Sequence, residues 1–237
     1  MSVDDKQKGH LHPISRAIFE VKTIFAELGF AVATGPEMEN EFYNFDALNI
    51  PKDHPARDMQ DTFWLKEQKG DSERKLLRTH TSPVQIRYMQ NHKPPIRIIA
   101  PGKIFRNEAT DTTHEAQFFQ VEGLYIDKEV SMAHLKGTLL YFLKKFFNDE
   151  NIEVQFRPSY FPFTEPSAEV FMKWKGKWLE VGGSGLVHPN VLKSAGVAEG
   201  YTGFAFGMGL DRLVMLKTGV PDVRMMYNGD LRLVNQF

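Results

Sequence analysis

The chain has 237 residues, with 29 lysines and arginines against 30 aspartates and glutamates, and it contains no cysteine. A chain of this length forms one sizeable domain, and the absence of cysteine excludes a disulfide scaffold, a thiolate metal site and a cysteine nucleophile, and favours a cytoplasmic location. The formal net charge of -1 argues against binding nucleic acid by bulk charge, although a local basic stripe or a basic partner would supply that contact.

The chain begins with a polar segment, MSVDDKQKGH, of mixed charge, so residues 1–10 are expected to form a disordered lead. Residues 11–237 contain no internal repeat and no low-complexity linker, and are predicted to fold as one domain. The longest apolar stretches, such as LLYFL, are far shorter than the roughly 18 residues that span a bilayer. No membrane association is therefore expected.

Four helices are predicted from apolar residues that recur three and four positions apart. The first occupies residues 13–29 and is closed by its terminal glycine. The second has Ser82 as its expected N-cap, with Gln85 placed to complete a capping box. The third begins near Ser131 and the last near Gly207.

Short runs rich in branched and aromatic residues lie between these helices and are predicted to be strands. They read FAVA, DTFWL, KLLRT, IRIIA, KIFR, FFQVEGLYI, IEVQFR, VFMKW and KWLEV. Several are joined by hairpin-length connections such as Lys175-Gly176, which antiparallel strands use and parallel strands do not. The predicted fold class is α+β, an antiparallel sheet flanked by helices. No phosphate-binding GxGxxG or GxxxxGK[ST] motif occurs.

Residues 103–126 hold the densest set of candidate polar side chains. Arg106 and Glu108 are two positions apart and project to one face of a strand, as do Gln120 and Glu122. If the two strands pair, these residues form a strip that holds both an anion and a cation. An exposed sheet face with ordinary ion pairs would give the same pattern.

Three other segments combine backbone freedom or aromatic surface with polar residues. GFAFGMGLDRL has three glycines that permit close approach to the backbone before a helix containing Arg212, although tight packing alone would also explain them. RPSYFPFTEPSAEVF places Phe161 and Phe163 on one side of an extended segment, as core residues or as the wall of an aromatic pocket. RTHTSPVQ has His80 and Ser82 at a strand end, where a purely structural role is also common.

Taken together and in this order, the segments resemble the catalytic core of the class II aminoacyl-tRNA synthetases, and most specifically the alpha subunits of bacterial phenylalanyl-tRNA synthetases. The first class II motif is matched by the helix from Pro13 followed by GFAVATGPEME, which contains Pro36. The second is matched by FRNE and the third by GFAFGMGLDRL. Each motif alone is loose, whereas all three in order with THTSPVQ and FPFTEPS between them are specific.

This resemblance implies a site for ATP. Arg106 would hold the α-phosphate, Glu108 would accept from the adenine amino group and His114 would approach the outer phosphates. Phe118 and Arg212 would sandwich the adenine ring and, with Arg106, Arg212 would serve catalysis. Asp211 stands where family members commonly have glutamate, and a shorter ion pair is expected there.

The resemblance also implies a site for phenylalanine and one for Mg²⁺. The residues expected to fix the amino acid are His80, Ser82, Gln120, Glu122, Phe161, Phe163, Thr164 and Ala205. Glu122 would complement the ammonium group, and the two phenylalanines would pack against the substrate ring. Glu165 and Glu180 would help to hold Mg²⁺ on the phosphates.

The implied activity is that of a phenylalanine--tRNA ligase, which joins phenylalanine to ATP to form phenylalanyl-adenylate and transfers the amino acid to tRNA(Phe). Family members begin with a long coiled coil that contacts tRNA, and few residues precede Pro13 here, so transfer is expected to need a beta-type partner subunit. Self-association as a homodimer is the other expected assembly. Two alternatives remain: a non-catalytic amino-acid-binding paralogue, and an adenylate-forming ligase with a non-tRNA acceptor.

Overall fold

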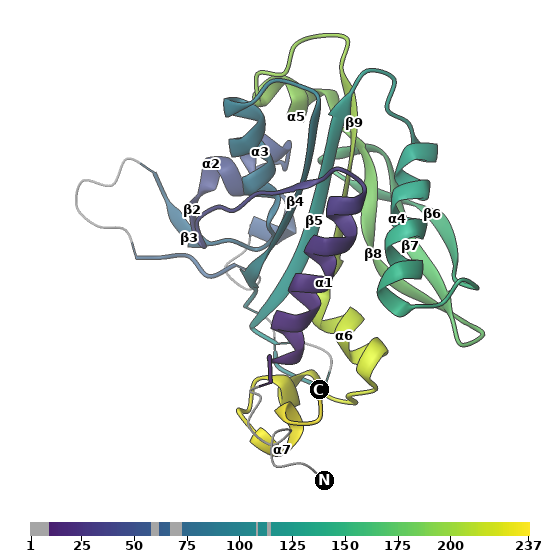
Figure 1. The fold of residues 1–237 in the computed structure, drawn as a ribbon. Helices are drawn as coiled ribbons and strands as arrows, with labels where there is room; N and C mark the ends of the chain where they lie inside the picture. Colours follow the sequence, from purple (N-terminus) through teal and green to yellow (C-terminus); the bar gives the residue numbers. More distant parts are fainter. Residues whose placement is uncertain (1–9, 58–61, 67–72, 108, 113–114) are drawn as a thin grey trace.

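The structure is a computed structural model that describes residues 10–57, 62–66, 73–107, 109–112 and 115–237. Apart from His10, the predicted lead at residues 1–10 lies outside the described residues. The described part of the chain forms a seven-stranded sheet in the order β1-β4-β5-β9-β8-β7-β6, and a separate two-stranded sheet of β2 and β3 (Figure 1). The predicted α+β class is confirmed.

The strands of the large sheet are β1 (Ala31–Val32), β4 (Ile96–Phe105), β5 (Gln117–Asp127), β6 (Glu153–Phe161), β7 (Thr164–Trp174), β8 (Lys177–Val187) and β9 (Thr202–Gly209). The small sheet consists of β2 (Met38–Asn40) and β3 (Lys75–Leu77). All pairings within the large sheet are antiparallel except the short parallel pair of β1 with β4.

The helices are α1 (Pro13–Glu27), α2 (Glu41–Asn44), α3 (Ser82–Asn91), α4 (Met132–Phe147), α5 (Pro189–Ser194), α6 (Leu210–Thr218) and α7 (Leu231–Val234). Short 3-10 turns are η2 (Asp46–Leu48), η3 (Pro55–Arg57) and η4 (Val223–Met226). Helices α1, α4 and α6 pack on one face of the sheet, and α2, α3 and α5 lie on the other, so each face has its own hydrophobic core (Figure 1).

Successive side chains of β9 point to opposite faces of the sheet. On β9, Phe204, Phe206 and Met208 are buried in the core beneath α1 and α4. The intervening positions, Ala205 and Gly207, point the opposite way and are small. The sheet therefore has a shallow floor on the side of α3, and this floor positions the candidate site.

Several predicted boundaries differ from the structure. The first helix is confirmed, and ends where Gly29 adopts a left-handed φ of 77°. The last helix begins at Leu210 rather than near Gly207, because β9 continues through the glycines to Gly209. IRIIA and KIFR are one strand, β4, since the pairing with β5 is unbroken across Pro101.

The start of α3 shows a second difference. Ser82 is the first helical residue and Thr81 is the N-cap, so the predicted capping box is wrong. The side chain of Gln85 instead donates to Glu122 on β5, as does the hydroxyl of Ser82. A carboxylate from the sheet thus replaces a local cap at this helix end.

No helix in the described segments combines the length and the apolar character needed to cross a membrane.

Candidate active site

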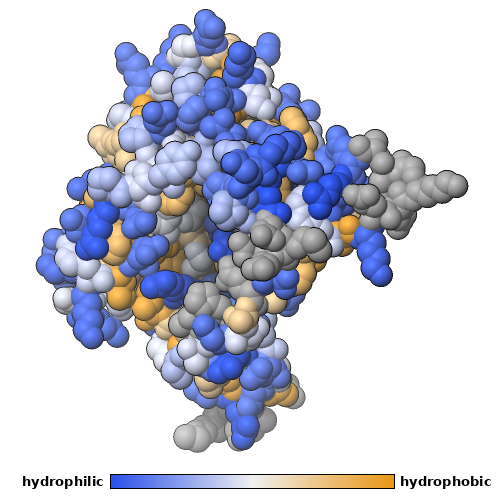
Figure 2. Space-filling view, turned by 180° about the vertical axis from the view of Figure 1, so that it is seen from behind, coloured by the Kyte–Doolittle hydropathy of each residue, from blue (hydrophilic) through white to orange (hydrophobic). Residues whose placement is uncertain are grey.

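A cavity of about 630 Å³ opens on the sheet face that carries α3. Figure 2 shows the side of the molecule opposite to the view with α1 in front, where hydrophobic surface lies inside a central recess bordered by hydrophilic residues. The cavity has two chemically different ends. We call them the aromatic end, lined by His80, Ser82, Gln120, Glu122, Phe161, Phe163, Thr164 and Ala205, and the arginine end, lined by Arg106, Glu115, Phe118, Glu180, Asp211 and Arg212.

Glu122 is the buried acid of the aromatic end. Its carboxylate accepts hydrogen bonds from the Thr81 amide at 3.0 Å, the Ser82 hydroxyl at 2.6 Å and the Gln85 amide nitrogen at 2.6 Å. Burial raises the pKa of Glu122, and these three donors oppose that rise. None of the three donors is a cation, so a cationic ligand would complete the pairing of this carboxylate.

His80 and Gln120 supply polar atoms available to a ligand. Within the part of the chain that the structure describes, both ring nitrogens of His80 and the Oε1 atom of Gln120 are buried without a hydrogen bond of ordinary geometry. Burial, assisted by the positive charge of Arg106, lowers the pKa of His80 from 6.5 to about 3, so the imidazole is neutral near pH 7. Because an unpaired buried polar atom costs free energy, these atoms indicate that a polar ligand belongs here.

The aromatic wall is formed by Phe161 and Phe163, whose rings are stacked with centroids 5.8 Å apart and an interplanar angle of 10°. The ring of Phe163 also lies 6.5 Å from that of His80. Gly183 on β8 leaves room for Phe161, since a Cβ at this position would approach the ring to 2.8 Å. The site thus offers a flat apolar slot beside a buried acid.

Thr164 and Ala205 line the same slot. Thr164 is buried, and its hydroxyl lies 2.7 Å from the Ser167 hydroxyl, which orients it within the β6–β7 turn. Ala205 lies on the floor of the cavity opposite Leu124 of β5. The structure therefore brings together every residue that was predicted to bind the amino acid.

The arginine end combines cations with an aromatic ring. The guanidinium carbon of Arg106 lies 5.2 Å from the centroid of the Phe118 ring, and its Nε atom donates to the Thr79 carbonyl oxygen at 3.3 Å. Arg212 is exposed in the first turn of α6. The two arginines and Phe118 therefore line one region, in which an aromatic, anionic ligand fits.

Asp211 is held in a different way from the predicted short ion pair. Its carboxylate accepts the Phe119 amide at 2.7 Å and the Tyr227 hydroxyl from η4, and no ion pair of Asp211 occurs among the described residues. Burial raises the pKa of Asp211, against the effect of these two donors. This residue joins β5, α6 and η4 next to Arg212.

The two predicted magnesium ligands are not brought together. Glu180 lines the cavity, whereas the side chain of Glu165 is 74% exposed and lies 3.3 Å from His188. Glu180 faces Phe171 across β7 and β8, and Glu165 lies about 20 Å farther along β7 at the usual rise per residue. One ion cannot bind both carboxylates in this arrangement.

No group of three or more metal-binding side chains occurs among the residues that the structure covers. Mg²⁺ that arrives on nucleotide phosphates needs only one or two protein carboxylates, and Glu180 and Glu115 at the arginine end fit that requirement. Of the other predicted residues of this end, Glu108 and His114 lie outside the described residues.

One part of the site was not predicted. Phe45, Leu48, Ile50, His54 and Ala56 also line the cavity. Their segment, FDALNIPKDHPAR at residues 45–57, lacks a strong helical or strand period, so periodicity did not reveal it. Its signal is chemical, because an arginine placed among acidic and apolar residues suggests a buried ion-pair cluster.

Comparison with known proteins identifies the family. The family model "tRNA synthetases class II core domain (F)" matches residues 1–237. The "Phenylalanine--tRNA ligase alpha subunit" of Proteus mirabilis is 58% identical over 98% of this chain and 69% of its own length. The chain belongs to the family of phenylalanine--tRNA ligase alpha subunits. The corresponding subunit of Synechocystis is 54% identical over 98% of the chain and 68% of its own length.

Two solved structures of lower sequence identity share the fold of this chain. Pyrrolysyl-tRNA synthetase from Desulfitobacterium hafniense superposes with a TM-score of 0.71 at 19% identity, over 91% of this chain and 73% of that one. A second structure of that enzyme gives a TM-score of 0.68 at the same identity, with coverage of 90% and 70%. At such low identity the likeness concerns the fold alone, and it confirms the predicted class II architecture. The family also implies use of ATP.

Proposed function

We propose that this alpha subunit activates phenylalanine with ATP and, with a beta-type subunit, transfers it to tRNA(Phe). The observation that carries the proposal is that one cavity holds both an aromatic slot beside a buried acid and a pair of arginines beside an aromatic ring. The first set fits an aromatic amino acid, and the second fits a nucleotide. A shared cavity allows the two substrates to meet.

Phenylalanine binds at the aromatic end. Its ring enters the slot beside Phe161 and Phe163, and its ammonium group lies against the carboxylate of Glu122, which then carries a negative charge. Neutral His80 and Gln120 use their unpaired polar atoms on the polar groups of the substrate. The substrate carboxylate is left facing the arginine end.

ATP binds at the arginine end, with its adenine between Phe118 and Arg212 and its α-phosphate at Arg106. A carboxylate oxygen of phenylalanine attacks the α-phosphorus, the bond to the bridging oxygen breaks, and pyrophosphate leaves. Arg106 stabilises the negative charge that develops on the phosphoryl oxygens. The enzyme accelerates the reaction by positioning and charge stabilisation, and forms no covalent intermediate with the protein.

Bound Mg²⁺ supplies neutralisation of phosphate charge, and Glu180 with Glu115 would hold it at the arginine end. Glu165 has no part in this site, because it lies far along β7 beside His188.

Assembly follows from the names of the relatives, which are called alpha subunits. We therefore expect a beta-type subunit to bind tRNA. The formal net charge of -1 on this chain agrees with this, because binding of nucleic acid relies on positive charge.

Phenylalanine-dependent exchange of pyrophosphate into ATP tests the activation step. Exchange is expected with phenylalanine and not without it, and its absence in folded protein would favour the non-catalytic paralogue. Charging of tRNA(Phe), with and without a beta-type subunit, tests the transfer step. Exchange without charging in either assembly would favour a ligase with another acceptor.

A further inference from the structure

Residues 45–57, which we call the 45–57 loop, supply part of the cavity wall. It contains the 3-10 turns η2 and η3 and little other regular structure. Nevertheless Phe45, Leu48 and Ile50 are buried and line the cavity. The backbone of this loop lacks the regular hydrogen bonds of a helix or strand, so other interactions must hold its apolar side chains in place.

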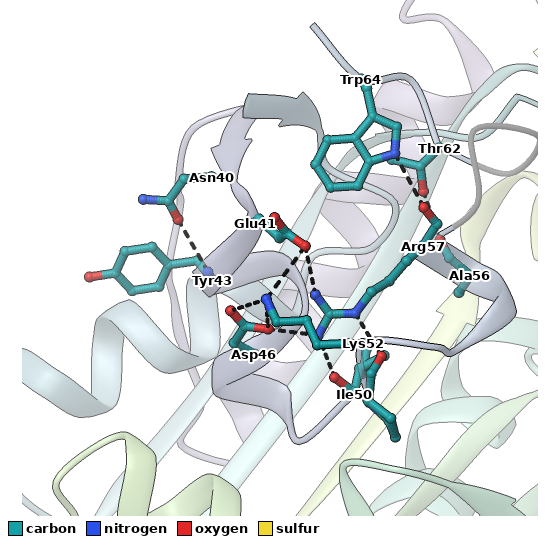
Figure 3. Close-up of polar contacts among 11 residues, drawn as sticks. Asn40, Glu41, Tyr43, Asp46, Ile50, Lys52, Ala56, Arg57, Thr62 and Trp64 are labelled. Carbon is teal, nitrogen blue, oxygen red and sulfur yellow. Dashed lines mark hydrogen bonds and ion pairs between the residues drawn. The ribbon is translucent and has the colours of Figure 1, made fainter. Parts of the chain in front are cut away.

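Arg57 fixes the loop through a set of polar contacts (Figure 3). Its side chain is only 6% exposed, and its Nε atom donates to the Pro51 carbonyl oxygen at 2.7 Å. One terminal nitrogen donates to Glu41 at 2.9 Å, and the other donates to Asp46 at 2.7 Å and to the carbonyl oxygen of Ile50. The guanidinium thus binds two carboxylates and two backbone carbonyls at once.

The same guanidinium supports the apolar side of the wall. Its central carbon lies 4.8 Å from the ring centroid of Phe45, which is fully buried and lines the cavity. The backbone of Arg57 is fixed in turn by the Trp64 indole, which donates to its carbonyl oxygen at 3.3 Å. Arg57 therefore links the position of Phe45 to the course of the loop.

A second contact ties the loop to the turn that carries Phe161 and Phe163. The side-chain amide of Asn49 donates to the Pro162 carbonyl oxygen at 2.7 Å, between Phe161 and Phe163 in sequence. The Asn190 amide of α5 donates to Asn49 at 3.0 Å. Asn49 adopts a left-handed φ of 60°, which asparagine tolerates better than most residues. Asn49 thus fixes the position of the 45–57 loop relative to the segment that carries Phe161 and Phe163.

We propose that Arg57 is a positioning residue that sets the width of the aromatic end and so its selectivity for an unsubstituted phenyl ring. This inference rests on the proposed function, since it assigns phenylalanine to the slot. A lysine at this position keeps the charge but cannot bind four acceptors in a planar fork. The loop would then lose its fixed backbone while the arginine end stays intact.

Lys52 offers a matched control. Its Nζ atom lies 3.1 Å from Asp46 and 3.6 Å from Glu41, the same two carboxylates that Arg57 binds, but the side chain is 72% exposed. An exposed ion pair contributes little, so Lys52→Gln is expected to leave the loop unchanged. Comparing the two variants distinguishes the effect of the buried Arg57 hydrogen bonds from the effect of removing one positive charge near Glu41 and Asp46.

The test uses calorimetric binding of phenylalanine, of para-chlorophenylalanine and of ATP to the full chain, with thermal unfolding measured in parallel. Arg57→Lys and Arg57→Gln are expected to weaken phenylalanine binding about tenfold and to reduce the preference over the para-chloro analogue, with ATP binding unchanged. Lys52→Gln is expected to match the wild type. Asn49→Asp, which removes the donor to Pro162 without touching the buried charge, is expected to shift selectivity in the same direction.

Unchanged selectivity in Arg57→Lys and Asn49→Asp would overturn the proposal, as would an equal loss of ATP and phenylalanine binding. If Arg57→Lys does not fold, Asn49→Asp alone decides, because it leaves the ion-pair cluster intact. Failure of the wild-type chain to bind phenylalanine would instead contradict the proposed function itself.

Discussion

The two ends of the cavity use opposite physical strategies. At the aromatic end, Glu122 and Thr164 are buried, His80 is neutral, and the rings of Phe161 and Phe163 are stacked. At the arginine end, Arg212 is exposed and Phe118 is half-buried. One end is a packed slot with fixed polar atoms, and the other is a more exposed region in which two arginines lie among the carboxylates of Glu115, Glu180 and Asp211.

This difference separates selectivity from reactivity. A packed slot selects its ligand by shape and by buried polar groups that the ligand must pair. Displacing its side chains by about a few tenths of an ångström therefore changes which ligand binds. The more exposed end acts through charge, which tolerates small displacements but not loss of the charge. Substitutions at the arginine end should therefore lower the rate, and those at the aromatic end should change amino-acid affinity.

The largest effect is expected for Arg106→Ala. Loss of the guanidinium removes stabilisation of the developing phosphoryl charge, so phenylalanine-dependent pyrophosphate exchange should fall by roughly 10²- to 10³-fold. Phenylalanine affinity should change little. Arg97→Ala is a control, because Arg97 is an exposed arginine that packs over Tyr125, 4.3 Å from its ring centroid, away from the cavity. Full exchange activity in Arg106→Ala would remove this residue from the reaction.

Glu122→Gln should have the next largest effect, on phenylalanine binding. The neutral amide loses the charge complement of the ammonium group, and the expected weakening measured by calorimetry is about 10- to 100-fold. Glu39→Gln is the matched control, since Glu39 is an equally buried carboxylate that pairs with Arg87 at 2.7 Å outside the cavity. It should lower stability without altering the affinity. An unaltered affinity in Glu122→Gln would contradict the assignment of the ammonium site.

Gly183→Ala is expected to raise the KM for phenylalanine about tenfold, with the KM for ATP unchanged. The added Cβ would lie 2.8 Å from the ring of Phe161, so the ring must shift into the slot. Gly137→Ala is the control, because no atom lies within 4 Å of a Cβ at Gly137 in α4. That change should stabilise the fold slightly through helix propensity. Equal kinetics in the two variants would show that the slot tolerates the shift.

The smallest effect is the dependence of stability on pH through His80. The pKa of His80 is about 3 in the folded chain and 6.5 when the side chain is exposed. Between these pH values the unfolded state binds a proton on His80 and the folded state does not. This contribution to stability is complete above pH 6.5 and is lost as the pH falls from 6.5 towards 3. The expected loss is about 1 kcal/mol between pH 7 and pH 5.5, measured by chemical denaturation.

His80→Asn supplies the reference for that measurement, because asparagine does not titrate. Burial raises the pKa values of Glu122 and Asp211, which gives them the opposite pH trend, but both are present in wild type and variant. The difference between the two pH profiles therefore isolates His80. Parallel profiles would show that His80 is protonated or solvated in the folded protein.

Much of this site was predictable because motifs are local. Strand periodicity places Gln120 and Glu122 on one face of β5, and the family resemblance adds His80 and Ser82, which lie just before and at the start of α3. The aromatic pair followed from an extended proline-rich segment. The fold class likewise followed from hairpin-length connections, whereas β9 was not among the predicted strands because its alternate residues are glycine or alanine.

The remainder depends on contacts that no local pattern encodes. Glu165 was grouped with Glu180 through the family resemblance, yet strand register places them far apart. Arg57 collects acceptors from α2, η2 and the backbone of its own loop, which are adjacent only after folding. Likewise Gln85 fits a local capping box by spacing, but Glu122 from another element takes its hydrogen bond. Long-range partners of this kind outcompete local ones when they are charged and buried.

The carboxylate of Asp211 joins the C-terminal segment to the arginine end of the cavity. It links the Phe119 amide, one residue from Phe118, to the Tyr227 hydroxyl, one residue from Met226, whose carbonyl oxygen lies 2.7 Å from the imidazole Nε2 of His12. A continuous series of contacts therefore runs from the start of α1 to the neighbour of Phe118, the ring that we propose to stack on adenine. Under that proposal, a subunit that contacts the surface around η4 and the start of α1 would change the affinity for nucleotide without entering the cavity.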